Sequence, residues 1–208
     1  MEATTDMTTG EWLTCKADTD YEILKAYPHT IRRKSNGRIV SETPLPGGYL
    51  KMNLNGETTY KHRVVALQFI PNDDPVNKTQ VDHINWQRDD NRVENLRWVT
   101  ALQNNLNRSS SKGVEYVFVD EDELPDDIIP VTKYGDVDIE QDEIAYYYSQ
   151  TTDKFYMYNG VRYREEAIRE NKRGGAYVNM YEAEKRDGEK RKTVKVYYLT
   201  FKKMYDLI

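Results

Sequence analysis

An acid and a base stand side by side in the middle of the sequence, at Asp82 and His83, and two asparagines follow at Asn95 and Asn104. Imidazole is the side chain that exchanges a proton near pH 7, so acid–base chemistry is what such a pair could support. An Asp-His pair alone is most often a pair of surface residues. The elements around it must therefore decide between the two interpretations.

The residues around this pair predict a strand, a loop, a second strand and a helix. Gln80–His83 is a short strand that ends in the acid and the base. Asn85–Glu94 is a long loop without glycine, rich in side chains that bond their own backbone. Leu96–Val99 forms the second strand. Thr100 and Gln103 make a capping-box pattern, so a helix begins at Thr100 and carries Asn104 in its first turns.

This arrangement resembles the HNH nucleases, and more closely the HNH homing endonucleases. The resemblance lies in Asp82-His83, in Asn95 nine residues before Asn104, in the run DNRVENLRWVT over 90–100, and in the lead-in residues 62–66 and 71–72. Residues 11–38 are similar to a small N-terminal DNA-binding module that is often fused to such nucleases. Together the resemblance covers about half of the chain.

The resemblance implies a ββα-metal finger with a defined division of labour. Asp82 and Asn104 would hold one divalent ion, Mg²⁺, for which Mn²⁺ would substitute. His83 would be the general base that deprotonates the attacking water, and Asn95 would brace the loop and orient His83. The cysteine pairs that carry a structural zinc in many HNH proteins are missing, because Cys15 is the single cysteine.

The implied function is that of a sequence-specific DNA endonuclease, a metal-dependent hydrolase. A monomer would nick double-stranded DNA and a homodimer would cut both strands; a small-molecule substrate is not expected. A non-catalytic DNA-binding protein that retains the HNH fold is the alternative, and a non-specific degradative nuclease is a third interpretation. His62 has a structural or a phosphate-positioning role.

The chain also predicts a degenerate internal duplication of a hairpin, a glycine pair, a second hairpin and a helix. Residues 21–70 and 144–208 both follow this order. The alignment pairs Gly47-Gly48 with Gly174-Gly175, and it places Tyr197 or Tyr198 at the position of His62. In the helices it pairs Val65 and Phe69 with Phe201 and Tyr205. Chance similarity between two hairpin segments is the alternative.

Charge is distributed unevenly along the 208 residues, whose formal net charge is −5. Residues 1–113 carry +1, residues 114–143 carry −11 and residues 144–208 carry +5. We expect an acidic connector between a neutral and a basic module. Basic residues near the hairpin turns and after the finger are the candidates for DNA contact: Arg32, Arg33, Lys34, Arg38, Arg108, Arg162, Arg164, Lys190, Arg191 and Lys192, together with His62.

These observations predict an α+β protein with an HNH finger flanked by two hairpin-plus-helix modules. The expected parts are a tail (1–10), an N-terminal DNA-binding module (11–70), the finger (71–113), the acidic connector (114–143) and a C-terminal basic module (144–208). The longest apolar run has five residues, far below the roughly 20 that cross a membrane. A secretory start is also missing, so we expect an intracellular protein, in the nucleus or the cytoplasm, without a membrane partner.

Overall fold

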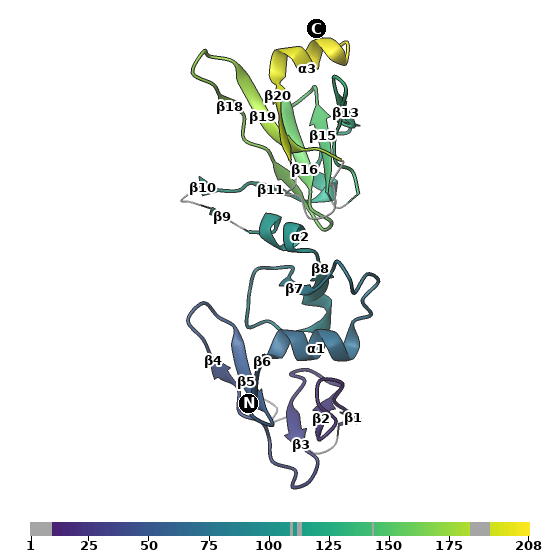
Figure 1. Cartoon of the computed structure of the whole chain (residues 1–208), viewed down its shortest axis with the longest axis vertical. Coiled ribbons are helices and arrows are strands. Elements are labelled where there is room, and N and C mark those ends of the chain that lie inside the picture. The colour runs from purple at the N-terminus through teal and green to yellow at the C-terminus, as the bar shows by residue number, and fades with distance from the viewer. Residues whose placement is uncertain (1–9, 109, 112–113, 143, 184–191) are drawn as a thin grey trace. The chain divides into compact units, whose positions relative to one another are not determined.

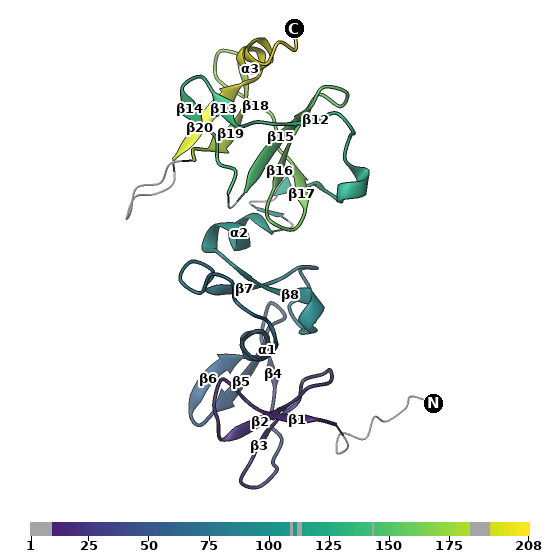
Figure 2. The same ribbon diagram turned by 90° about the vertical axis from the view of Figure 1, so that its right-hand side faces the viewer.

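The computed structural model describes residues 10–108, 110–111, 114–142, 144–183 and 192–208. It divides into two compact units, Met1–Asn104 and Asn105–Ile208. Both units are built mostly of short antiparallel strands with few helices, as expected for an α+β chain (Figures 1 and 2). Across the described part of the chain, no helix is long and apolar enough to span a bilayer.

Two small antiparallel sheets and a helix begin the first unit. The second sheet turns at Asn55-Gly56, where both residues have positive φ, as the hairpin prediction requires. The helix α1 follows the last strand without a loop. The elements are β1 (Trp12–Thr14), β2 (Tyr21–Leu24) and β3 (Ile31–Arg33) in one sheet, β4 (Thr43–Pro44), β5 (Leu50–Leu54) and β6 (Glu57–Tyr60) in the other, and α1 (Lys61–Phe69).

The candidate finger has the predicted elements with the predicted bounds. Strands β7 (Gln80–His83) and β8 (Leu96–Val99) pair antiparallel, and a short 3₁₀ turn, η1 (Val93–Asn95), closes the loop between them. The capping box is present: Gln103 N donates to Thr100 Oγ1 at 3.2 Å, and Thr100 N donates to Gln103 Oε1 at 3.1 Å. Helix α2 (Ala101–Leu106) therefore begins directly after Thr100.

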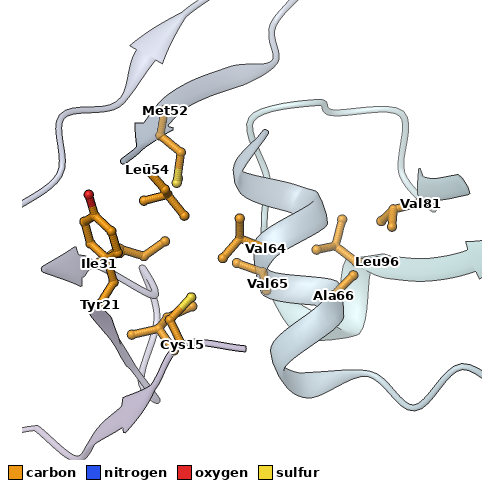
Figure 3. Close-up of a cluster of buried hydrophobic side chains, with 11 residues drawn as sticks. Cys15, Tyr21, Ile31, Met52, Leu54, Val64, Val65, Ala66, Val81 and Leu96 are labelled. Carbon is orange, nitrogen blue, oxygen red and sulfur yellow. The ribbon is translucent and has the colours of Figure 1, made fainter. Parts of the chain in front are cut away.

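One hydrophobic core joins the finger to the N-terminal sheets through α1. Val64 and Val65 of the helix face Leu54 and the other buried residues of the first strands (Figure 3). On the other side of the helix, Val81 of β7 and Leu96 of β8 belong to the same cluster. Since α1 contributes buried side chains in both directions, the finger and the N-terminal module are packed as one body.

The second unit contains the segment that we predicted to be an acidic connector, and that prediction is wrong. Strand β11 pairs with β17, and β12 pairs with β15, so both ends of the segment are edge strands of a five-stranded sheet. The order in this sheet is β11 (Phe118–Val119), β17 (Tyr163–Glu165), β16 (Lys154–Tyr158), β15 (Ala145–Ser149) and β12 (Ile128–Pro130). The remaining elements of 105–143 are β9 (Ser110–Ser111), β10 (Val114–Glu115), η2 (Glu121–Glu123), β13 (Lys133–Tyr134) and β14 (Val137–Asp138).

The end of the chain repeats the order of β4, β5, β6 and α1. Strands β18 (Arg169–Glu170), β19 (Ala176–Tyr181) and β20 (Thr193–Tyr197) form an antiparallel sheet, and α3 (Tyr198–Met204) follows at once. This agrees with the predicted order of elements, while a common origin stays a prediction. The predicted turn at 187–188 lies outside the described residues.

The hydrogen bonds correct the predicted alignment of the two segments by one residue. Gly48 N donates to Leu45 O and Leu45 N to Tyr49 O; Gly174 N donates to Asn171 O and Asn171 N to Gly175 O. Gly48 therefore corresponds to Gly174, and Tyr49 to Gly175. Cross-strand pairs then match Tyr60 with Tyr197, which places Leu199, and not a tyrosine, at the position of His62. In the helices the buried Val64 corresponds to the buried Phe201.

Candidate active site

His83 ends β7 in a buried position, and a loop asparagine holds its ring. The residue is 3% exposed, and its Nε2 lies 3.4 Å from Asn91 Oδ1. An amide oxygen can only accept, so Nε2 carries the hydrogen and Nδ1 keeps the lone pair of a neutral imidazole. Asn91 is fixed in turn, because its Nδ2 donates to Asp89 O at 2.9 Å. The sequence alone does not indicate this role, since an asparagine in a polar loop is typical of a turn.

Asn95 braces the loop between the two strands. Its Oδ1 accepts a hydrogen bond from Asn85 N at 3.0 Å, and its Nδ2 donates to Asp90 O at 2.7 Å. Its backbone carbonyl accepts from Ile84 N, so both ends of the loop are tied to this residue. The hydrogen bond on the His83 ring that we expected from Asn95 is made by Asn91.

Asp82 lies on β7 opposite Arg97 of β8, and the two side chains form an ion pair. Arg97 Nε and one terminal nitrogen lie 3.0 and 2.8 Å from the same carboxylate oxygen. The Asp82 side chain is 8% exposed and that of Arg97 15%, so the pair is sheltered from water. Arg97 was not among the predicted site residues, although the pairing of the two predicted strands places it directly across from Asp82.

Asn104 reaches the same strand from helix α2. Its Nδ2 donates to Gln80 Oε1 at 2.5 Å. Gln80 and Asp82 are two residues apart on β7, and alternate residues of a strand share a face. The predicted ligands Asp82 and Asn104 are thus brought to one face of the hairpin, whereas the neighbouring Asn105 accepts from Arg108.

Burial keeps the histidines of the site neutral. The pKa of His83 is lowered chiefly because burial disfavours the charged imidazole, against the hydrogen bond with Asn91 and the charge of Asp82, which raise it. Burial also lowers the pKa of His62, to about 3, and the neighbouring His83 adds to this effect. A neutral His83 is the form that accepts a proton from water.

Aromatic rings surround His83 on the side of the N-terminal sheet. The ring centroids of His62 and His83 are 5.1 Å apart, and those of Tyr49 and His83 are 5.9 Å apart. His62 is 7% exposed and therefore does not offer the exposed phosphate contact that we considered for it. Tyr49 was not predicted as a site residue; the sequence shows it only as the first residue of a strand.

The basic candidates for DNA contact fall into three groups. Lys34, Arg38, Arg108 and Lys192 are exposed, and Lys190 and Arg191 lie outside the described residues. Arg32, Arg33 and Arg162 are half-buried. Arg32 pairs with Glu22 and lies over Trp12, while Arg33 donates to the Tyr21 hydroxyl and to Asn55 Oδ1.

Arg164 is a correction to this set. The residue is 8% exposed and pairs with Glu166 on the same segment, and its guanidinium lies 4.3 Å from the ring centroid of Tyr116. A buried guanidinium that is already paired stabilises the second unit and is not presented to a phosphate.

Comparison with known proteins decides the family of this site. Residues 59–106 match the sequence model of the HNH endonucleases. Residues 59–106 belong to the HNH endonuclease family. The HNH segment includes α1 and starts before the boundary that we predicted at residue 71, in agreement with the common core. It does not include Tyr49.

A protein of Acanthamoeba polyphaga mimivirus, described as an uncharacterized HNH endonuclease, is 46% identical over 79 residues. The match covers 36% of this chain and 20% of that relative, so the chain spans about a fifth of the length of the relative it matches. Its name extends the HNH assignment to a curated protein without adding a substrate. A search of solved structures gave no match.

Proposed function

We propose that the chain is a DNA endonuclease of the homing type, which hydrolyses one phosphodiester with His83 as general base and one divalent metal ion. The observation that carries the proposal is the state of His83. Its Nε2 hydrogen is held by Asn91 Oδ1, which leaves Nδ1 as the basic atom. Membership of residues 59–106 in the HNH endonuclease family supports the same chemistry.

The residues present fit a hard divalent ion. Asp82 offers a carboxylate and Asn104 an amide oxygen, from elements that meet at one face of the β7–β8 hairpin. Such an ion prefers oxygen ligands and keeps several waters, so two protein ligands suffice. No cluster of three or more histidine, cysteine or acidic side chains was found among the described residues. When bound, the ion would neutralise charge on the scissile phosphate and the leaving oxygen.

The work of the protein's own residues follows from the geometry. His83 Nδ1 takes the proton of the attacking water, and the Asn91 amide oxygen stabilises the resulting imidazolium through its hydrogen bond to Nε2. The bracing by Asn95 fixes the loop that carries Asn91. The exposed Lys34, Arg38, Arg108 and Lys192 supply phosphate contacts to duplex DNA. Nicking is the expected product of a single site.

One observation favours the non-catalytic alternative. Arg97 already pairs with the Asp82 carboxylate at 2.8 Å, which competes with a cation for the same oxygens. A protein that keeps this pair would bind DNA without cutting it. The distinction rests on whether a divalent ion binds in its presence.

Cleavage of a library of random duplexes in Mg²⁺, followed by sequencing of the cut ends, tests the proposal. We expect nicks at one preferred sequence, none in EDTA, and none from the His83→Ala variant. Binding without nicks in Mg²⁺ or Mn²⁺ would establish the non-catalytic alternative. Nicks at unrelated sequences would indicate a degradative nuclease.

A further inference from the structure

The ring of the proposed general base is held by more than its hydrogen bond. At 3.4 Å, the contact between His83 Nε2 and Asn91 Oδ1 is long. A single hydrogen bond at one ring edge leaves the ring free to turn about that bond. Rings packed from the side are needed to fix the direction of the opposite nitrogen.

Two rings from the N-terminal half supply this packing. His62, the second residue of α1, meets His83 at an interplanar angle of 61°, and Tyr49, just before β5, meets it at 57°. Tyr49 also packs against His62, with ring centroids 5.1 Å apart. The three rings therefore contact one another pairwise, and an edge-to-face arrangement of this kind is favourable.

The loop of the finger fixes Tyr49 from its other side. The Arg88 guanidinium lies 5.0 Å from the centroid of the Tyr49 ring and donates a hydrogen bond to Gly47 O at 3.1 Å. Gly47 has a φ of +100°, and a Cβ there would lie 3.3 Å from the Arg88 side chain. The turn before β5 is thus shaped to receive an arginine from the loop that also carries Asn91.

The second unit provides an internal comparison. It has the same order of hairpin and helix but no strand-loop-strand insertion after the helix. At the positions that correspond to Tyr49 and His62 it has Gly175 and Leu199, and Leu199 is 65% exposed. A hairpin followed by a helix therefore forms without either ring. The two rings are found where the finger packs.

The imidazole of His62 is not explained by stability. Its Nδ1 is buried and has no hydrogen-bond partner among the described residues, which is an unfavourable arrangement for a polar atom. Leucine would fill a buried position at the start of a helix without that cost, as Leu199 shows that the local fold accepts it. A flat ring, unlike leucine, packs beside another imidazole without covering the nitrogens at its edge.

We propose that Tyr49 and His62 are positioning residues, which together fix the His83 ring so that Nδ1 points at the attacking water. The inference rests on the proposed nuclease function for its consequence in catalysis. It makes the N-terminal hairpin, outside the HNH segment, a required part of the active site.

Nicking rates and stability of three variants of the full chain test the proposal. His62→Leu and Tyr49→Leu should each lower kcat by about 10- to 100-fold, because a misplacement of about 1 Å can cost 10²-fold, with KM changed less than about threefold. Tyr49→Phe retains the ring and should retain the rate. His62→Leu should leave the thermal midpoint equal or higher, since it removes a buried unpaired nitrogen. Leu199→Ala, at the matching place in the second unit, is the control and should leave kcat unchanged.

Imidazole nitrogen NMR gives a readout that does not depend on cleavage. The chain has three histidines, so the signals of His83 are assigned by single substitutions. In the wild type we expect one tautomer with the hydrogen on Nε2, and in the two leucine variants a mixture of tautomers. A wild type that never nicks would refute the proposed function, whereas the NMR comparison would still decide on positioning. Unchanged His83 signals in both leucine variants, or unchanged kcat, would overturn the inference.

Discussion

At the scale of single residues, the candidate site separates into groups that do chemistry and groups that hold them. His83, Asp82 and Asn104 were predicted from spacing, and the structure brings Asp82 and Asn104 to one face of the hairpin. Asn91 and Arg97 act on them through hydrogen bonds that the sequence does not specify. Each group makes a different prediction for the same assay.

Replacing the base should abolish cleavage and leave binding nearly intact. We expect His83→Ala to lower the nicking rate by about 10²–10⁴, the usual cost of losing a general base, while DNA affinity stays within about threefold. His29→Gln is the matched control: His29 is also buried, but its ring packs on Phe69, away from the site. Retention of full activity by the His83→Ala variant would remove His83 from the mechanism.

Replacing either proposed ligand should change the metal requirement. We expect Asp82→Asn and Asn104→Ala to raise the Mg²⁺ concentration for half-maximal nicking by at least about 10-fold, with partial recovery in Mn²⁺. Asn105→Ala is the control, because its side chain faces Arg108 and not β7. A loss in the Asn105→Ala variant with normal activity in Asn104→Ala would assign the ligand to Asn105.

At the scale of elements, predictability follows how local the cause is. Strands β7 and β8 and the start of α2 came out as predicted, because alternation and the Thr100–Gln103 capping box act over a few residues. The acidic segment was misread because its charge was counted while the partners of β11 and β12 lie tens of residues away. Arg164 was misassigned for a related reason, since its pairing with Glu166 depends on burial.

The capping box also connects stability with the position of Asn104. We expect Thr100→Ala to lower the free energy of unfolding of the first unit by about 1 kcal/mol, the typical cost of an N-cap, as measured by chemical denaturation. The helix carries Asn104 one turn later, so the Mg²⁺ requirement should rise in the same variant. Thr100→Ser keeps the capping oxygen and should match the wild type in both measurements. An unchanged Mg²⁺ requirement in Thr100→Ala would show that α2 holds Asn104 without its cap.

At the scale of the whole molecule, the charge of each unit limits what the second unit can contribute to DNA binding. Residues 105–208 contain 21 acidic and 17 basic residues, a net charge of −4, because the acidic segment is part of the same fold. The predicted contrast between an acidic connector and a basic module therefore does not describe a physical body. Phosphate contacts from this unit must come from a few exposed residues such as Arg108 and Lys192.

Truncation after residue 113 tests this local contribution. The shortened chain keeps the first unit, with its core and all of the proposed catalytic residues, so it should still nick DNA at low salt. Removing one basic group from a phosphate flattens the dependence of log affinity on log salt by about 0.9. Without the few exposed basic residues of the second unit, the slope should therefore fall by about 2, binding at moderate salt should weaken, and the choice of sequence should relax. Titration of both chains at several salt concentrations measures the difference. If affinity, slope and cleavage site are the same in both, the second unit does not contact DNA, and its role would then be sought in folding or in association between copies of the chain.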